Sequence, residues 1–445
     1  MIVAWTTLTY RMVTNTSTRM VRGMATDREF DIILVGATGF VGRLTAEHLR
    51  DHAPEGTRIA LAGRSADRLA ALGKDLGPAA MTWPQIVVDT TDRASCDELA
   101  PRATTVITTV GPYARYGHEL IRACAEAGTH YCDLTGEVLF VRDVADGLHE
   151  LARQTGARLV TSCGFDSIPS DLAVWEAART AREAGAGELG ETTLYVRSLR
   201  GGVSGGTIDS MRQQAIEAAS DQAARKIVLD PYGLSPDRAA EPRSSHGTKP
   251  KSSGALGTAK RLIGHLPVSR DDQGHWTGPF IMASYNTRIV RRTNALLAWR
   301  YGRGFRYREV MDFGAKATSP VMATGMAAAL GGLVAGMSFS PTRNLLGKVL
   351  PEPGEGPSAE SQAKGRFRME VVAETTQGRT VRSTVAAKAD PGYSGTAIML
   401  GQSGLCLALD DLVSDGGVLT PAVAMAEPLI ERLRAQGFEI TSALD

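Results

Sequence analysis

The sequence predicts an α/β fold, in which a doubly wound parallel sheet carries an inserted α+β second domain. Three observations lead to this prediction. Short apolar runs alternate with helix-like patterns from Ile32 to Cys163, and three glycines stand where the first run meets the first helix. From Gly164 onward, longer half-buried strand patterns replace the alternation. Because strands joined by helices pair in parallel, helices should cover both faces of the first sheet.

Composition limits the classes of protein to which the chain can belong. Its 445 residues suffice for two or three domains, and 43% hydrophobic with 22% charged residues is ordinary for a globular protein. A net charge of +1 creates no field that would favour nucleic acid. The five cysteines are odd in number and lack C-x-x-C spacing, which predicts buried free thiols, a cytoplasmic location and no metal site.

The first strand and its glycines predict a Rossmann-type dinucleotide site. Residues 32–35 form an apolar run that leads into a turn and a helix. The expected cofactor-binding residues of this turn are Gly36, Ala37, Thr38, Gly39, Phe40, Val41 and Gly42. Gly36 permits the tight turn, Gly39 lets the backbone approach a pyrophosphate, and Gly42 lets the helix lie close to the sheet. The helix N-terminus would then offer its free N–H groups to the phosphates.

The second strand, residues 58–62, indicates which dinucleotide the site accepts. An NAD enzyme usually places an acid after this strand to hold the ribose 2′-hydroxyl, whereas this chain has Arg64 followed by Ser65. A guanidinium suits a 2′-phosphate, and an acid would repel it. We therefore expect NADP(H) rather than NAD(H) as the cofactor, with both residues at its 2′-phosphate.

The next strands extend this site, because ligands gather at the carboxyl ends of parallel strands. Residues 85–88 end at Asp89, which could hydrogen-bond the adenine. Residues 105–110 end at Gly111 and Pro112, which should border the nicotinamide ribose, and Tyr113 follows directly. Further helices are expected at 117–127 and 141–155, and further strands at 130–134 and 158–163.

The second half of the chain predicts a different, largely antiparallel sheet. Residues 192–199 alternate like a half-buried strand, and 366–373 with 379–387 look like a hairpin. A helix is expected at 396–408, and another one begins at Pro421. We expect a disordered N-terminal extension at 1–26, the dinucleotide-binding domain at 27–165, a second domain at 166–415 and a segment at 416–445 that returns to the first domain. Within the second domain, we expect a mobile loop at 235–272 and an uncharged apolar stretch at 317–342.

Several motifs resemble those of a known family. The segments 36–42, 62–65, 110–113 and 163–167 resemble the saccharopine dehydrogenase-like oxidoreductases, and 200–207 with 416–421 resemble one branch, the trans-acting enoyl reductases. The resemblance implies reduction of a carbon–carbon double bond on an acyl chain that a polyketide synthase carries, within lipid biosynthesis. Relatives in higher organisms associate with lipid droplets. The resemblance supplies no catalytic residue to carry over to this chain.

The chemistry leaves alternatives open. Enoyl reduction needs a proton donor, and the candidates are Tyr113, Tyr116, His118 and Tyr131. Tyr113 directly follows the fourth strand, although it could equally be a tyrosine that covers the ribose. Asp166 and Ser167, at the end of the sixth strand, could as easily be a helix N-cap. An amino-acid oxidoreductase of the saccharopine dehydrogenase type is a rival reading, in which Arg197, Arg200 and Arg288 would bind substrate carboxylates. A third is a non-catalytic scaffold on lipid. The arginines between 288 and 308 could attract a carrier protein, and 317–342 could accept the acyl chain or contact a membrane peripherally.

Overall fold

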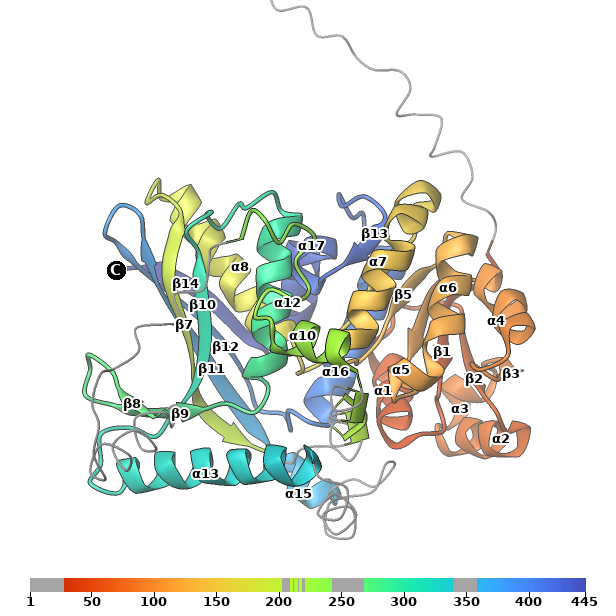
Figure 1. Ribbon diagram of the computed structural model, residues 1–445. Coiled ribbons are helices and arrows are strands. Elements are labelled where there is room, and N and C mark those ends of the chain that lie inside the picture. The colour runs from red at the N-terminus through yellow and green to blue at the C-terminus, as the bar shows by residue number, and fades with distance from the viewer. Residues whose placement is uncertain are drawn as a thin grey trace, which may run out of the picture.

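Two sheets, here called sheet A and sheet B, stand side by side with helices around and between them (Figure 1). The computed structural model describes residues 28–201, 209–210, 212–214, 216–217, 221–241, 268–338 and 358–445. The expected extension at 1–26 and most of the expected loop at 235–272 lie outside these ranges. Each sheet has seven strands within the described ranges.

Sheet A is the predicted doubly wound parallel sheet, and this prediction is confirmed. Its order is β13-β6-β5-β4-β1-β2-β3, and every pair is parallel. The strands are β1 (Phe30–Val35), β2 (Ile59–Gly63), β3 (Gln85–Val87), β4 (Ala103–Thr108), β5 (His130–Cys132), β6 (Arg158–Val160) and β13 (Gly417–Leu419). The seventh strand, β13, was not expected, because three residues show no periodicity of their own.

Both faces of sheet A are covered, which explains its uninterrupted apolar strands. In β1, Ile32 and Leu34 belong to one buried cluster, whereas Ile33 and Val35 belong to another. The first cluster packs under α1 (Phe40–His52), α2 (Ala66–Asp75) and α16 (Ser394–Leu409). The second packs under α4 (Arg93–Leu99), α6 (His118–Ala127) and α7 (Val138–Thr155). Short elements α3 (Pro78–Met81), η3 (Ala100–Arg102) and α5 (Tyr113–Tyr116) complete this layer.

Helix α16 lies on sheet A, although it follows the inserted segment in the chain. It packs against α1 and against strands β1, β4 and β5. Close approach depends on a glycine, since a Cβ on Gly401 would lie 2.6 Å from His48 Cδ2 in α1. Of its sixteen residues, twelve are buried, which explains why its sequence is apolar on all sides.

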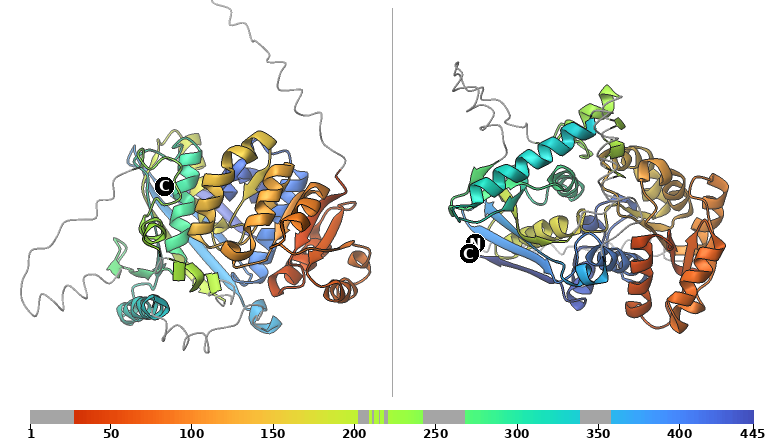
Figure 2. Two further views of the ribbon diagram at one scale, coloured as in Figure 1. Left: turned by 45° about the vertical axis from the view of Figure 1, so that its right-hand side comes forward. Right: turned by 90° about the horizontal axis from the view of Figure 1, so that it is seen from below.

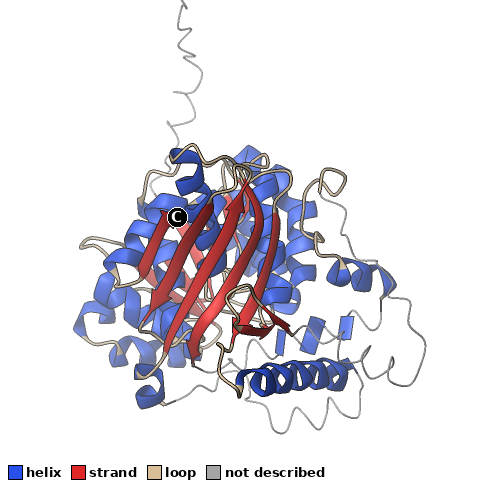
Figure 3. Ribbon diagram, turned by 90° about the vertical axis from the view of Figure 1, so that its left-hand side faces the viewer, coloured by secondary structure: helices blue, strands red, loops and turns tan. Residues whose placement is uncertain are grey.

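Sheet B has the order β14-β12-β11-β7-β10-β9-β8, and only its β7–β10 pair is parallel. Figure 3 shows one face of this sheet toward the viewer, with helices behind it. The expected hairpin is present as β11 and β12. The strands are β7 (Leu189–Arg200), β8 (Ser269–Arg270), β9 (Trp276–Pro279), β10 (Arg306–Asp312), β11 (Arg366–Thr375), β12 (Thr380–Ala387) and β14 (Glu439–Leu444). The C-terminal segment therefore reaches both sheets, through β13 and then β14.

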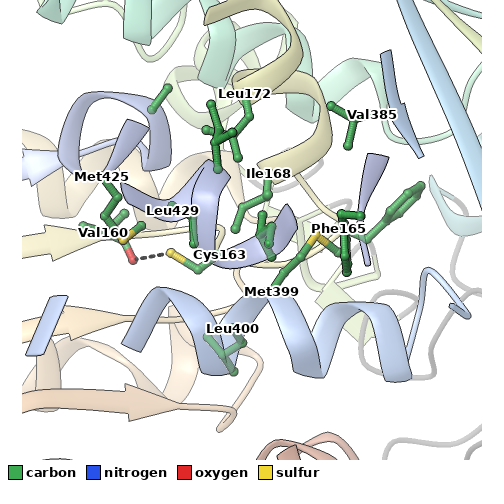
Figure 4. Packing of buried hydrophobic residues seen from close by; sticks show 14 of the residues in the cluster. Val160, Cys163, Phe165, Ile168, Leu172, Val385, Met399, Leu400, Met425 and Leu429 are labelled. Atoms are coloured by element: carbon green, nitrogen blue, oxygen red, sulfur yellow. Dashed lines mark hydrogen bonds between the residues drawn. The ribbon is translucent and has the colours of Figure 1, made fainter. Parts of the chain in front are cut away.

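The space between the sheets is filled by α8 (Ile168–Glu183), α12 (Ala283–Leu296), α17 (Pro421–Ala424) and α18 (Ala426–Ala435). The helix expected from Pro421 is thus divided in two at Met425. Figure 4 shows the apolar packing around α17 and α18. Cys163 and Phe165 follow β6 and belong to the same buried cluster as Met399 of α16 and Leu429 of α18. All five cysteines are buried and free, as predicted.

The uncharged stretch forms a helix on the outside of the molecule. Helix α13 (Ser319–Ser338) packs along β9 and lies at the periphery in both views of Figure 2. Ala323 and Ala327 face the protein, while Val321 and Met322 are 73% and 56% exposed. In the ranges that the structure describes, no helix is long and apolar enough to cross a membrane. Helices α10 (Gln222–Leu229) and α15 (Ala359–Ala363) are the remaining short elements.

Candidate active site

The turn after β1 has the backbone geometry that its glycines predict. Gly36 has a φ of +82°, and a Cβ there would also lie 2.7 Å from Thr109 Oγ1. A Cβ on Gly42 would overlap the main chain of Gly36, with the carbonyl carbon 2.9 Å away and the oxygen closer still. These two glycines therefore set the shape of the turn and the approach of α1 to it.

Gly39 differs, because its Cα faces open space. Among the described residues, a Cβ there would have a single atom within 4 Å, the Gly36 carbonyl oxygen at 3.3 Å. The residue is exposed, has an extended backbone and stands at the N-cap of α1, where no side chain caps the helix and no acid lies in the first turn. The first-turn N–H groups and the positive end of the helix dipole therefore fit an anionic pyrophosphate. Phe40 and Val41 begin the helix beside this position, and buried Ala37 supports it.

The end of β2 presents two arginines. Arg64 is exposed, and Ser65 accepts a 3.4 Å hydrogen bond from the Arg68 main-chain N–H at the start of α2. Arg68 also reaches back, since its Nη2 donates to the carbonyl oxygen of Thr38 at 2.9 Å. The second arginine therefore links α2 to the glycine turn. Sequence reasoning missed Arg68, which lies in the first turn of α2, shortly after the end of β2.

Asp89 lies at the neighbouring strand end, as expected. Its carboxylate accepts hydrogen bonds from the main-chain N–H of Thr91 at 2.9 Å and from Thr91 Oγ1 at 2.8 Å. These bonds, and to a lesser degree the charge of Arg64, hold the pKa of Asp89 below its usual value. The structure thus brings Arg64 and Asp89 to one edge of sheet A. An adenine contact for Asp89 stays a prediction.

The segment after β4 is held by a buried carboxylate. Gly111 is exposed and Pro112 precedes α5, whose first N–H groups are not free: Glu137 accepts the N–H of Tyr113 at 2.9 Å and that of Ala114 at 2.8 Å. This bridge from the β5 end fixes Gly111 and Pro112 at the carboxyl edge of the sheet. Their proximity to a nicotinamide ribose follows from the topology and stays a prediction.

The geometry argues against Tyr113 as the proton donor. Its side chain is 4% exposed, its hydroxyl donates to the Thr108 carbonyl at 3.2 Å, and the hydroxyl accepts the Leu134 N–H at 3.1 Å. Burial, and then nearby carboxylates, raise the pKa of this phenol well above its ordinary value. Tyr113 therefore joins the ends of β4 and β5 and does not face the site.

Burial also perturbs two aspartates at the ends of β5 and β6. It raises the pKa of Asp133 and of Asp166 to about 7. Asp133 has a structural role, because its Oδ1 accepts the N–H groups of Thr135 and Ser162 and its Oδ2 accepts the Tyr131 hydroxyl. Asp166 is only half-buried and has no such set of donors.

Three of the arginines expected to face a carrier protein lie inside the fold instead, whereas Arg300, Arg303, Arg306 and Arg308 are exposed. Arg288 and Arg292 are 8% and 3% exposed, and with Arg291 they donate to main-chain carbonyls of residues 228–234 and of Tyr307 and Val418. Burial lowers the pKa of all three. The docking hypothesis was wrong for these residues, because the helix carries them inward, where peptide oxygens bind the Nη atoms of Arg291 and Arg292 while their Nε atoms stay buried without a partner in the described ranges.

The described ranges hold no group of three or more His, Cys, Asp or Glu side chains that could bind a metal ion. The residues of this site fit a dinucleotide, because the N-terminus of α1 is uncapped, the space over Gly39 is open and the end of β2 carries two arginines. They offer two titratable strand-end carboxyls for proton chemistry.

Comparison with known proteins places this site in a family. Residues 32–163 match the family described as saccharopine dehydrogenase NADP binding domain, which confirms NADP(H) as the cofactor. A solved structure of apo saccharopine dehydrogenase (L-Glu forming) from Saccharomyces cerevisiae is 14% identical, with a TM-score of 0.49, and the match covers 93% of this chain and 99% of that one.

Relatives match over almost the whole chain. A Mycobacterium tuberculosis protein is 49% identical over 421 residues, covering 94% of this chain and 98% of that protein. The trans-acting enoyl reductase of Mycobacterium bovis BCG is 46% identical over 417 residues, covering 92% and 97%. That of Mycobacterium ulcerans is 45% identical over 421 residues, covering 93% and 98%. The protein therefore belongs to the family of the trans-acting enoyl reductases, and residues 32–163 are its NADP-binding domain.

Proposed function

We propose that the chain is an NADPH-dependent enoyl reductase that acts in trans on an acyl thioester carried by a polyketide synthase in lipid biosynthesis. The observation that carries the proposal is the identity of 45–46% with proteins of that name over more than nine-tenths of both chains. The dinucleotide-binding turn supports it, since Gly36, Gly39 and Gly42 each have the geometry that cofactor binding needs.

The reaction sets three requirements: a hydride at the β-carbon, stabilisation of the resulting enolate, and a proton at the α-carbon. Bound NADPH supplies the hydride. The protein's part is to hold the pyrophosphate at the first turn of α1, the 2′-phosphate beside Arg64 and Arg68, and the reacting end at Gly111 and Pro112. Seven parallel strands fix these segments along one edge, so their spacing does not depend on a flexible loop.

The surface of α13 supports an apolar substrate. A helix without charged residues that exposes Val321, Met322 and Met326 to water leaves apolar area uncovered. An amino acid offers nothing to cover it, whereas a long acyl chain does. The helix therefore favours an acyl substrate over a small polar one.

The rival amino-acid oxidoreductase is disfavoured by its own candidate residues. Arg197 is bound to Asp312 at 2.5 Å and to Glu370 at 2.7 Å, so its charge is already paired. Arg288 donates to main-chain carbonyls and is buried. Two of the three cations proposed for substrate carboxylates are thus engaged in the fold.

The proposal is tested by NADPH oxidation at 340 nm with purified protein. One arm offers a long-chain trans-2-enoyl thioester of pantetheine, a second offers the same acyl group on a carrier protein, and a third offers 2-oxoglutarate with lysine. We expect oxidation in the first two arms, with a saturated product two mass units heavier, and none in the third. Turnover of the amino-acid pair would replace the proposal with the rival activity, and inertness in every arm would favour a non-catalytic scaffold.

A further inference from the structure

Three carboxyl groups, those of Asp133, Glu137 and Asp166, lie at the ends of β5 and β6. Their closeness is visible in two ways. A Cβ on Gly136 would lie 3.7 Å from Asp166 Oδ1, and the pKa of the Tyr113 phenol is raised first by burial and then by the charges of all three carboxyls. The group therefore sits where the strands of sheet A end, beside the segment that carries Gly111 and Pro112.

The three carboxyls differ in their hydrogen bonds. Asp133 accepts from two main-chain N–H groups and one phenol. Glu137 accepts from two main-chain N–H groups and from Ser210 Oγ at 2.7 Å. Asp166 accepts only from its own N–H, and no other described residue donates to it. Asp133 and Glu137 thus hold the loops in place through their hydrogen bonds. The carboxyl of Asp166 makes no such bond to another described residue, so its contacts indicate no structural role.

Helix capping does not explain Asp166 either. Helix α8 begins at Ile168, and no side chain caps it. The N–H groups of Ser167 and Ile168 both donate to the Gly164 carbonyl, at 3.3 and 3.0 Å, so a turn of the main chain starts the helix. A half-buried carboxyl without partners costs stability, and such groups concentrate at sites of proton transfer.

We propose that Asp166 is the catalytic acid of the enoyl reduction. The β-carbon of the substrate accepts the hydride and its electron pair from NADPH, and the π electrons move toward the thioester carbonyl. The α-carbon then takes the proton from the Asp166 carboxyl, which leaves a saturated thioester, NADP⁺ and an aspartate that solvent reprotonates. This assignment rests on the proposed function.

The environment of Asp166 suits an acid that works near neutral pH. Burial raises its pKa to about 7, so the protonated form prevails below that pH and the rate should fall above it. The titratable groups around it are Asp133, Glu137, Tyr113 and Tyr285. The two phenols stay neutral because burial raises their pKa well above the ordinary value, and Asp133 is fixed by its three donors.

The test compares Asp166→Asn and Asp166→Ala with the wild-type protein on the enoyl pantetheine thioester. Asp166→Asn keeps the shape and removes the proton, so we expect kcat to fall by about 100-fold or more. NADPH affinity, measured by fluorescence titration, should change by less than about twofold, and the thermal midpoint should hold because no hydrogen bond is lost. Formate should restore activity to Asp166→Ala at least about fivefold, as an external acid that takes the vacated position.

A matched control is Asp133→Asn, a carboxyl of the same cluster and similar pKa. Its amide would face one of three donors, so we expect a lower thermal midpoint, the opposite pattern to Asp166→Asn. The proposal is overturned if Asp166→Asn retains activity within about threefold, if it loses NADPH binding or stability, or if formate rescues nothing. A wild-type protein that leaves enoyl thioesters unreduced overturns the proposed function itself, and the assignment of Asp166 with it.

Discussion

Of the three glycines in the first turn, Gly39 is expected to serve cofactor binding and Gly42 to serve the packing of α1. Single alanine substitutions should separate these two roles. In Gly42→Ala, the new methyl would lie 2.9 Å from the Gly36 carbonyl carbon and 3.0 Å from Ala37 Cα. Normal carbon contacts are about 3.5–4 Å, so the overlap with these two carbons is roughly 0.5–1 Å, and the overlap with the Gly36 carbonyl oxygen is larger, against backbone that cannot rotate away. Helix α1 must move off the turn.

The expected cost follows from two opposing effects. Overpacking of this kind costs about 3 kcal/mol at the upper end of its usual range, while alanine gains about 1 kcal/mol over glycine in a helix. Gly42→Ala should therefore lower the free energy of unfolding by about 2 kcal/mol. In Gly39→Ala the new methyl meets one atom of the described residues, at 3.3 Å, in a backbone conformation open to any residue. Because glycine is preferred to alanine at an N-cap, the free energy of unfolding of this variant should fall by no more than about 1 kcal/mol.

For NADPH binding, we expect the larger effect from substitution of Gly39 and the smaller effect from Gly42→Ala. With a pyrophosphate over Gly39, the added methyl displaces it, and the Kd for NADPH should rise at least about tenfold; Gly39→Val should abolish binding. Urea unfolding followed by circular dichroism gives the stability, and fluorescence titration gives the Kd. An unchanged Kd in Gly39→Val would refute this placement of the cofactor. Unaltered stability in Gly42→Ala would refute the close contact of α1 with the turn.

Three further predictions concern charged groups. Arg64→Asp should shift the cofactor preference from NADPH toward NADH. Arg68→Ala should weaken binding of 2′,5′-ADP about tenfold, and Arg68→Lys should weaken it less. Equal binding titrations for all variants would show that neither residue contacts the 2′-phosphate. Arg292→Ala should lower the free energy of unfolding by about 2–4 kcal/mol, because two buried carbonyls lose their donor, and an exposed Arg300→Ala control should be neutral in urea unfolding. Burial lowers the pKa of His48 from 6.5 to about 4, so the stability that neutral His48 contributes above pH 6.5, about 3 kcal/mol, is lost as the pH falls toward 4. The difference in free energy of unfolding between the wild type and His48→Gln should therefore shrink over that pH range. A difference that stays constant would contradict this prediction.

The parallel sheet could be predicted because its signals are local. Apolar runs, the glycine turn and the helix periods each fit within about fifteen residues, and sheet A follows from connection rules. Strand β13 could not be predicted in this way. It pairs with β6 across more than 250 residues of chain, and its three residues carry no pattern that distinguishes a strand from the lead-in to a helix.

The site could be predicted only where the backbone conformation, and not the direction of a side chain, determines the role of a residue. Gly36 has a positive φ and Gly42 has no room for a Cβ, so the roles of these two glycines could be read from spacing, and Gly39 follows from the same motif. Tyr113 could not be assigned, because the direction of its hydroxyl depends on Leu134, a residue that lies just after β5. Asp166 could not be told from a helix cap until the start of α8 was seen to be a main-chain turn.

The arginines of α12 show why a run of like charges is ambiguous in sequence. Their side chains were expected in water, yet Arg292 donates to Leu234 on one side and to Val418 of β13 on the other. Peptide oxygens can bind a guanidinium in the interior where distant segments of the chain supply them in the right directions, although the Nε of Arg292 has no partner among the described residues. The same contacts link the inserted segment to a strand of the cofactor sheet. The buried arginines of α12 therefore hold the inserted segment against sheet A. The members of the run that remain on the surface for a partner are Arg300, Arg303, Arg306 and Arg308.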